Sequence, residues 1–174
     1  MTQDASIRID TVLLSQVEML GDVLRARGWR LATAESCTGG LLAGTCTAPA
    51  GASDWFAAGF VTYANDAKTG LLGVHDALIA RHGAVSAEVA DAMARGALAH
   101  AKVQLAMSVT GIAGPGGGSA AKPVGTVWLG LAWTAAGGVD SRTECLHLDG
   151  DRAAIRAQTV DIALQRLAAA ARAP

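Results

Sequence analysis

The chain carries no excess of charge of either sign. Its 174 residues include 14 Lys and Arg against 15 Asp and Glu, which gives a formal net charge of -1. A protein that holds a polyanion by releasing counterions needs a surplus of basic side chains, and this composition does not supply one. We therefore expect no nucleic-acid partner.

A targeting leader and long apolar segments are also lacking. Residues 1–10 are polar, with neither a basic leader nor an apolar signal core, and we interpret them as a loose N-terminal tail. No segment approaches the roughly 20 uninterrupted apolar residues of a membrane-spanning helix. The sequence predicts a soluble, cytoplasmic protein without a membrane partner.

Cysteine is scarce, since only Cys37, Cys46 and Cys145 are present. Their odd number and the absence of CxxC spacing indicate neither a disulfide framework nor a zinc site, so we interpret them as small buried hydrophobic residues. The chain also lacks the GK[ST] ending of a P-loop and a cluster of carboxylates suited to magnesium. These absences weigh against a hydrolase that cleaves phosphate bonds of nucleotides.

Apolar residues recur first at helical and then at strand spacing along the chain. A first helix is predicted over residues 11–27, ended by Gly28. Further helices are predicted over 39–47, 65–72, 86–100 and from 151 onward, opened in three cases by Asn65, Ser86 and Asp151 as N-caps. Strands are predicted over 31–34, 55–63, 104–110, 126–133 and 139–148.

Alternating strands and helices predict a mostly parallel sheet covered by helices on both faces. The last two strands are joined by Ala135-Ala136-Gly137-Gly138, a connection short enough for a hairpin, which makes one strand antiparallel. The expected fold is a three-layer α/β/α sandwich with a five-stranded sheet, in a single domain over residues 1–174. The alanine-rich final helix has an apolar stripe that packs either against the core or against a second copy of the chain. We expect a homo-oligomer.

The most informative segment runs from Ala34 to Leu42, from a short strand through a turn of small residues into a helix. Such a turn presents Ser36 as a candidate nucleophile beside a helix N-terminus. Unpaired amides there are expected to stabilise negative charge, which makes Thr38, Gly39 and Gly40 candidate substrate-binding residues. The alternative is that Ser36 and Thr38 only cap the helix.

Ligands of open parallel sheets bind at the carboxyl ends of the strands. This rule brings Ser36, Tyr63, Lys68 and Thr110 to one edge of the predicted sheet, and the antiparallel strand lets the last strand deliver Arg152 to the same edge. The set contains a hydroxyl nucleophile, a possible amine base and further hydroxyl groups. These are the parts of an amide-hydrolysing or acyl-transferring site.

A serine nucleophile needs a base, and none of the histidines is well placed to serve. These are His75, His82, His100 and His147. Lys68 is the better candidate, provided that burial or a neighbouring cation lowers its pKa well below the ordinary value of about 10.4. Taken alone, a lysine such as Lys68 is usually a solvated helix residue, and a tyrosine such as Tyr63 is usually an amphipathic aromatic at a strand end.

A glycine-rich loop follows the third predicted strand. Long, irregular connections inside compact domains usually serve a site, although a bare connection is the alternative. Glycine backbone can approach a ligand closely, and the candidate binding residues are Gly111, Gly114, Gly116 and Gly117.

Several segments together resemble the CinA C-terminal domain family. They are Ala34-Glu35-Ser36-Cys37-Thr38-Gly39-Gly40, Gly59-Phe60-Val61-Thr62-Tyr63 with Lys68, Gly83-Ala84-Val85-Ser86, Ser108-Val109-Thr110-Gly111-Ile112-Ala113-Gly114-Pro115-Gly116-Gly117-Gly118-Ser119, Lys122-Pro123-Val124-Gly125-Thr126-Val127 and Gly150-Asp151-Arg152. The similarity covers nearly all of the chain beyond the first helix.

The resemblance implies hydrolysis of nicotinamide mononucleotide to nicotinic acid mononucleotide and ammonia in pyridine-nucleotide recycling, with no metal and no organic cofactor. It assigns the nucleophile to Ser36, the base to Lys68, and supporting roles to Tyr63, Thr110 and Arg152. Arg152 is expected to meet the substrate phosphate, unless it is a surface arginine paired with a nearby aspartate. Larger members carry a further pyrophosphatase-like domain, so the chain resembles the stand-alone form. The alternative is a nucleotide-binding regulatory module with little turnover.

Overall fold

A computed structural model describes residues 11–173, so the predicted N-terminal tail lies outside the described residues. The helices are α1 (Thr11–Arg27), α2 (Leu41–Cys46), α3 (Asn65–Leu72), α4 (Asp76–His82), α5 (Ala87–Ala101) and α6 (Arg152–Arg172), with a 3-10 turn η1 (Ala52–Asp54). The strands are β1 (Leu31–Glu35), β2 (Phe56–Val61), β3 (Leu105–Gly111), β4 (Thr126–Ala135) and β5 (Gly138–His147).

The five strands form one sheet in the order β2-β1-β3-β4-β5. Strand β1 is parallel to both β2 and β3, whereas β4 is antiparallel to both of its neighbours. Strand β4 is therefore the one reversed strand, and the predicted hairpin is confirmed by a turn at residues 136–137 that pairs Ala135 with Gly138. The predicted mixed sheet is confirmed.

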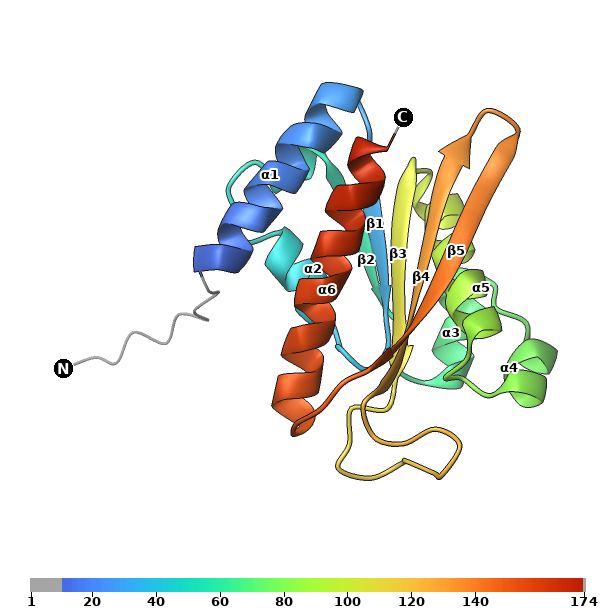
Figure 1. Cartoon of the computed structure of the whole chain (residues 1–174). Coiled ribbons are helices and arrows are strands. Elements are labelled where there is room, and N and C mark those ends of the chain that lie inside the picture. Colours follow the sequence, from blue (N-terminus) through green and yellow to red (C-terminus); the bar gives the residue numbers. More distant parts are fainter. Residues whose placement is uncertain (1–10, 174) are drawn as a thin grey trace.

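Helices cover both faces of the sheet, with α1, α2 and α6 on one face and α3, α4 and α5 on the other (Figure 1). Large side chains such as Leu105 and Met107 fill the core under α1 and α6, whereas Ala32, Ala34 and Ala106 face α5. These small residues let α5 lie close to the sheet. One close approach is at Gly130 of β4, where an added Cβ would lie 2.3 Å from the Ala90 carbonyl oxygen.

Two of the three predicted helix caps are confirmed. The Ser86 side chain accepts the Val89 amide, and Asp151 accepts the Ala154 amide. The cap predicted at Asn65 is wrong, because the last extended residue before α3 is Ala64 and Asn65 is already helical. The start predicted for the helix at residue 39 is also wrong, since Gly39 and Gly40 have positive φ angles and α2 begins at Leu41.

Helix α4 was not predicted, because its seven residues are too few to show a helical apolar period. In the chain from residue 11 to 173, no helix has both the length and the apolar character needed to cross a membrane.

Candidate active site

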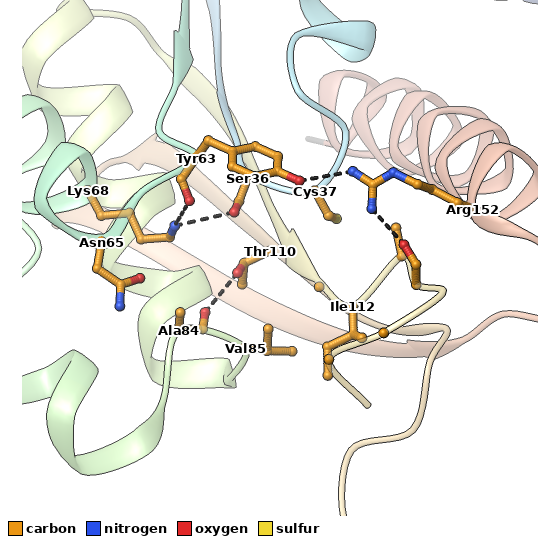
Figure 2. A pocket seen from close by; sticks show the side chains of 15 residues that line it. Ser36, Cys37, Tyr63, Asn65, Lys68, Ala84, Val85, Thr110, Ile112 and Arg152 are labelled. Atoms are coloured by element: carbon orange, nitrogen blue, oxygen red, sulfur yellow. Dashed lines mark hydrogen bonds between the residues drawn. The ribbon is translucent and has the colours of Figure 1, made fainter. Parts of the chain in front are cut away.

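A cavity of about 280 Å³ opens where β1, β2 and β3 end, between the glycine-rich loop and the loop that precedes α5 (Figure 2). Five of the side chains predicted to meet at this edge line the cavity: Ser36, Tyr63, Lys68, Thr110 and Arg152. The predicted loop glycines line it as well: Gly111, Gly114, Gly116 and Gly117. The topology therefore brings together residues that are as far as 116 positions apart in the chain.

Ser36 directly follows β1. Its amide donates to the Val109 carbonyl of β3 at 2.9 Å, which fixes the backbone of the serine against the sheet. The Oγ atom then lies 3.3 Å from Nζ of Lys68, and Figure 2 shows the two side chains pointing toward each other. A hydroxyl and an amine are thus held within reach for proton transfer.

Lys68 comes from the first turn of α3 and its residue is only 1% exposed. Nζ donates to the carbonyl oxygen of Thr62 at 2.8 Å and to that of Tyr63 at 3.3 Å. Burial lowers the pKa of the Lys68 amine, because removing water disfavours its charged form. The direction of this shift is the one that a lysine base requires.

The N-terminus of α2 is occupied by a side chain of the protein itself. The buried Glu35 carboxylate accepts the amides of Gly40, Leu42 and Ala43 at 2.8 to 3.0 Å. The expectation that unpaired amides of this helix face a ligand is therefore wrong. Glu35, the last residue of β1, takes the place that an anion would occupy.

The structure does not bring Thr38, Gly39 and Gly40 into the cavity lining. The Gly39 amide donates to the Ser36 carbonyl, which closes the turn. Within residues 11–173, the amides of Cys37 and Thr38 donate to no backbone carbonyl and to no carboxylate, and the group that they face is the Cys37 sulfur. These two amides immediately follow the candidate nucleophile.

Arg152 connects two walls of the cavity at its mouth (Figure 2). Its guanidinium donates to the Gly114 carbonyl at 2.8 Å and to the Tyr63 hydroxyl at 2.9 Å. The Tyr63 side chain is exposed, so its ring forms part of the rim. Because Arg152 bonds to the site and not to Asp149 or Asp151 in the described chain, it is not a surface arginine of an ion pair.

Thr110 ends β3 and its hydroxyl donates to the Ala84 carbonyl at 2.7 Å. This bond ties the strand to the loop that forms the opposite wall. Since the hydroxyl proton is used by Ala84, the oxygen is free only to accept a hydrogen bond from a ligand.

Several residues of the lining were not among those predicted from the sequence. They are Cys37, Asn65, Ala84, Val85, Ile112 and Ala113. The segment containing Ala84 and Val85 was noticed only as part of a family resemblance, and Asn65 was taken as a helix cap. Cys37 is 5% exposed, and burial is the main cause that raises the pKa of its thiol to about 11. Such a thiol is protonated at neutral pH and is a weak nucleophile.

No group of three or more His, Cys, Asp or Glu side chains within residues 11–173 is arranged to hold a metal ion. None of the cavity-lining residues is acidic. The basic groups at the cavity are the amine of Lys68 and the guanidinium of Arg152, and the charge of the guanidinium suits a ligand that carries negative charge.

Comparison with known proteins finds the family that the sequence motifs resemble, and it finds solved structures with the same fold. A model of the CinA C-terminal domain matches residues 14–171. The chain is 51% identical over 158 residues to "Nicotinamide-nucleotide amidohydrolase PncC" of Escherichia coli strain K12, covering 91% of this chain and 94% of that protein. It is 52% identical over 150 residues to the Pseudomonas putida protein of that name, covering 85% and 90%. The crystal structure of competence/damage inducible protein CihA from Agrobacterium tumefaciens matches with a TM-score of 0.87 at 42% identity, covering 94% of this chain and 98% of that one.

Proposed function

This chain belongs to the CinA C-terminal domain family, and we propose that it hydrolyses nicotinamide mononucleotide to nicotinic acid mononucleotide and ammonia. In this proposal Ser36 is the nucleophile and Lys68 is its base. The observation that supports the pairing is the distance of 3.3 Å between Ser36 Oγ and Nζ of the buried Lys68.

The hydrogen bonds of Lys68 suit a neutral amine. An uncharged amine has two N–H groups and one lone pair, and two backbone carbonyls, of Thr62 and Tyr63, accept from Nζ. In the structure Nζ also donates to Ser36 Oγ at 3.3 Å, and in the reactive form we propose that this contact is reversed, with the hydroxyl donating its proton to the lone pair of the neutral amine. A buried amine with a lowered pKa remains in this uncharged form over a wider pH range than a solvated lysine.

The reaction follows in two halves. Ser36 Oγ bonds to the carboxamide carbon while Lys68 takes the hydroxyl proton, and the carbonyl oxygen becomes an oxyanion. The C–N bond then breaks, Lys68 gives its proton to the departing nitrogen, and ammonia leaves an ester on Ser36. Water attacks this ester, Lys68 takes a proton from the water, and cleavage of the ester returns a proton to Ser36 and releases the carboxylic acid.

We propose that the amides of Cys37 and Thr38 stabilise the oxyanion, in place of the α2 amides that Glu35 occupies. Both amides lower the pKa of the Cys37 thiol against the larger effect of burial, so they favour negative charge beside a side chain that lines the cavity. Donors fixed before the reaction are effective because no reorganisation is needed when the charge develops.

The rim of the cavity is proposed to hold the rest of the nucleotide. Tyr63 offers an exposed ring beside the nucleophile, and Thr110 offers an oxygen that can accept from the carboxamide nitrogen. Arg152 uses one donor on Gly114 and one on Tyr63, so its remaining N–H groups are available for the phosphate.

Removing the Arg152 guanidinium tests phosphate recognition. Arg152→Ala is expected to lower kcat/KM for nicotinamide mononucleotide roughly 10- to 100-fold, the worth of a hydrogen bond to a charged group. Any weaker activity on nicotinamide riboside, which has no phosphate, should change little. Steady-state ammonia release from both substrates measures the difference, and equal losses on both would remove Arg152 from phosphate recognition.

The glycine loop is tested most cleanly at Gly116. A Cβ added there meets no atom within 4 Å and the φ angle is not positive, so Gly116→Ala is expected to leave the thermal midpoint unchanged. If the substrate approaches the loop backbone, KM for nicotinamide mononucleotide should rise several-fold. Gly137→Ala in the distant hairpin, which also meets no atom, is the matched control. A fall in thermal midpoint that parallels the loss of affinity would make the loop structural.

The proposed activity is tested by incubating the purified protein with nicotinamide mononucleotide and measuring ammonia. We expect ammonia and nicotinic acid mononucleotide in equal amounts. A protein that binds the nucleotide without releasing ammonia would instead be a regulatory module.

A further inference from the structure

Arg156 lies one helical turn beyond Arg152 in α6, outside the cavity lining but against the turn that follows Ser36. Its Nη2 donates to the Thr38 carbonyl at 2.8 Å. A Cβ placed on Gly39 would also lie 3.5 Å from this nitrogen, so the guanidinium rests directly on the turn.

The charge of Arg156 is not balanced by any acidic side chain. Within residues 11–173, the guanidinium makes no ion pair, and its Nε is buried without a hydrogen-bond acceptor. A half-buried cation without a counterion is costly unless it serves an anionic group. The nearest place where negative charge would form in the proposed reaction is beside Ser36.

We propose that Arg156 is a positioning residue for the amide-hydrolysing centre, which holds the Cys37 and Thr38 amides in place and adds positive charge behind them. This inference rests on the proposed function.

The hydrogen bonds of the turn show how the positioning works. On one side, Glu35 holds the Gly40 amide at 3.0 Å, and the Gly39 amide closes the turn onto the Ser36 carbonyl. The Thr38 carbonyl, in contrast, accepts the Leu41 amide only at 3.3 Å, so the shorter bond from Arg156 is its main restraint. Removing that bond leaves the peptide after Thr38 held only by the Gly39 amide and the longer Leu41 bond, so the Cys37 and Thr38 amides, which precede this peptide, lose their support from α6.

The field of Arg156 reaches the cavity. Among the groups that influence the Cys37 thiol, the charge of Arg156 lowers its pKa, against the larger effect of burial, which raises it. The same charge favours any anion that forms where Cys37 lines the cavity, and an oxyanion on the substrate carbon is such an anion.

Three substitutions separate the contributions of charge and hydrogen bond. Arg156→Met keeps the apolar stem only, Arg156→Gln keeps a neutral donor, and Arg156→Lys keeps the charge. We expect Arg156→Met to lower kcat about 100-fold, as loss of an oxyanion donor does, while KM changes less than about threefold. The kcat of Arg156→Lys should be at least tenfold higher than that of Arg156→Met. The kcat of Arg156→Gln should lie between these two values.

Arg172→Met is the matched control, since Arg172 lies in the last turn of the same helix and far from the cavity. It should leave kcat, KM and the thermal midpoint unchanged. A purely structural Arg156 would give a different result: kcat would follow the thermal midpoint, and Arg156→Lys would recover nothing. Unchanged kcat in Arg156→Met would likewise overturn the proposal.

A second readout needs no turnover. In a Cys145→Ser background, which removes the most exposed thiol, the alkylation rate of Cys37 by iodoacetamide is measured at alkaline pH by peptide mapping. Arg156→Met and Arg156→Gln should slow this reaction at least a few-fold, whereas Arg156→Lys should not. An unchanged alkylation rate in all three Arg156 variants would refute the proposed effect of the Arg156 charge at the cavity. If the wild-type protein releases no ammonia but the thiol rates shift as expected, the proposed function fails while the placement of Arg156 stands.

Discussion

Replacement of Ser36 by alanine is expected to abolish ammonia release, lowering kcat on nicotinamide mononucleotide by about 10⁴-fold or more. Among residues 11–173 the hydroxyl bonds only to Lys68, and the backbone of Ser36 is fixed separately by the bond of its amide to the Val109 carbonyl. The thermal midpoint and the affinity for the substrate should therefore stay close to those of the wild-type protein. Calorimetry and steady-state kinetics on the same preparation measure both.

Cys37→Ser is the control for this prediction. The Cys37 thiol also lines the cavity, but burial raises its pKa to about 11, so it is protonated where the enzyme works. We expect this variant to keep most of the activity. Near-normal turnover in Ser36→Ala, together with a dead Cys37→Ser, would move the nucleophile to the thiol.

Substitution of Lys68 by methionine is expected to give the second largest loss, about 10²- to 10⁴-fold in kcat with a smaller change in KM. Methionine fills the space of the buried stem but cannot accept the Ser36 proton. It also leaves the carbonyls of Thr62 and Tyr63 without their donor, which costs stability. Lys68→Arg keeps donors for these carbonyls and stays charged, so it should fold and still be inactive.

The pH dependence of the wild-type enzyme follows from the same amine. Lys68 acts as a base only when neutral, and burial lowers its pKa from the ordinary value of 10.5. The rate constant kcat/KM is therefore expected to rise with pH up to this lowered pKa and to level off above it. At lower pH the amine is protonated and activity is lost. A flat profile through the neutral range, with an active Lys68→Met variant, would exclude lysine as the base.

The placement of the site residues at one edge of the sheet could be predicted, because it depends on the order and direction of the strands and not on exact interatomic distances. Strand-helix alternation makes β1, β2 and β3 parallel, so Ser36, Tyr63 and Thr110 must leave the sheet at one edge. The hairpin at residues 136–137 reverses only β4, which returns β5 to that edge and places Arg152 there. Each step follows from the period of the apolar pattern or the length of a connection.

The details of the turn could not be predicted in this way. That Glu35 fills the α2 N-terminus depends on two glycines in the left-handed region, which bend the chain so that helix amides point back at the strand end. The contact between Arg156 and Thr38 joins residues 118 positions apart and depends on how closely α6 packs on the turn. No local pattern in the sequence predicts either the Glu35 contacts or the contact of Arg156 with Thr38.

The central claim, that Ser36 forms a covalent intermediate in this cavity, is tested most directly by mass spectrometry of acid-quenched enzyme. The methyl ester of nicotinic acid mononucleotide is the suitable substrate, because methanol leaves more readily than ammonia and the ester on the enzyme should accumulate. We predict a mass increase equal to one nicotinic acid mononucleotide acyl group, carried by the peptide that contains Ser36 and absent from Ser36→Ala. An adduct on Cys37, or turnover of the ester by an enzyme that remains unmodified at every quench time, would contradict the account.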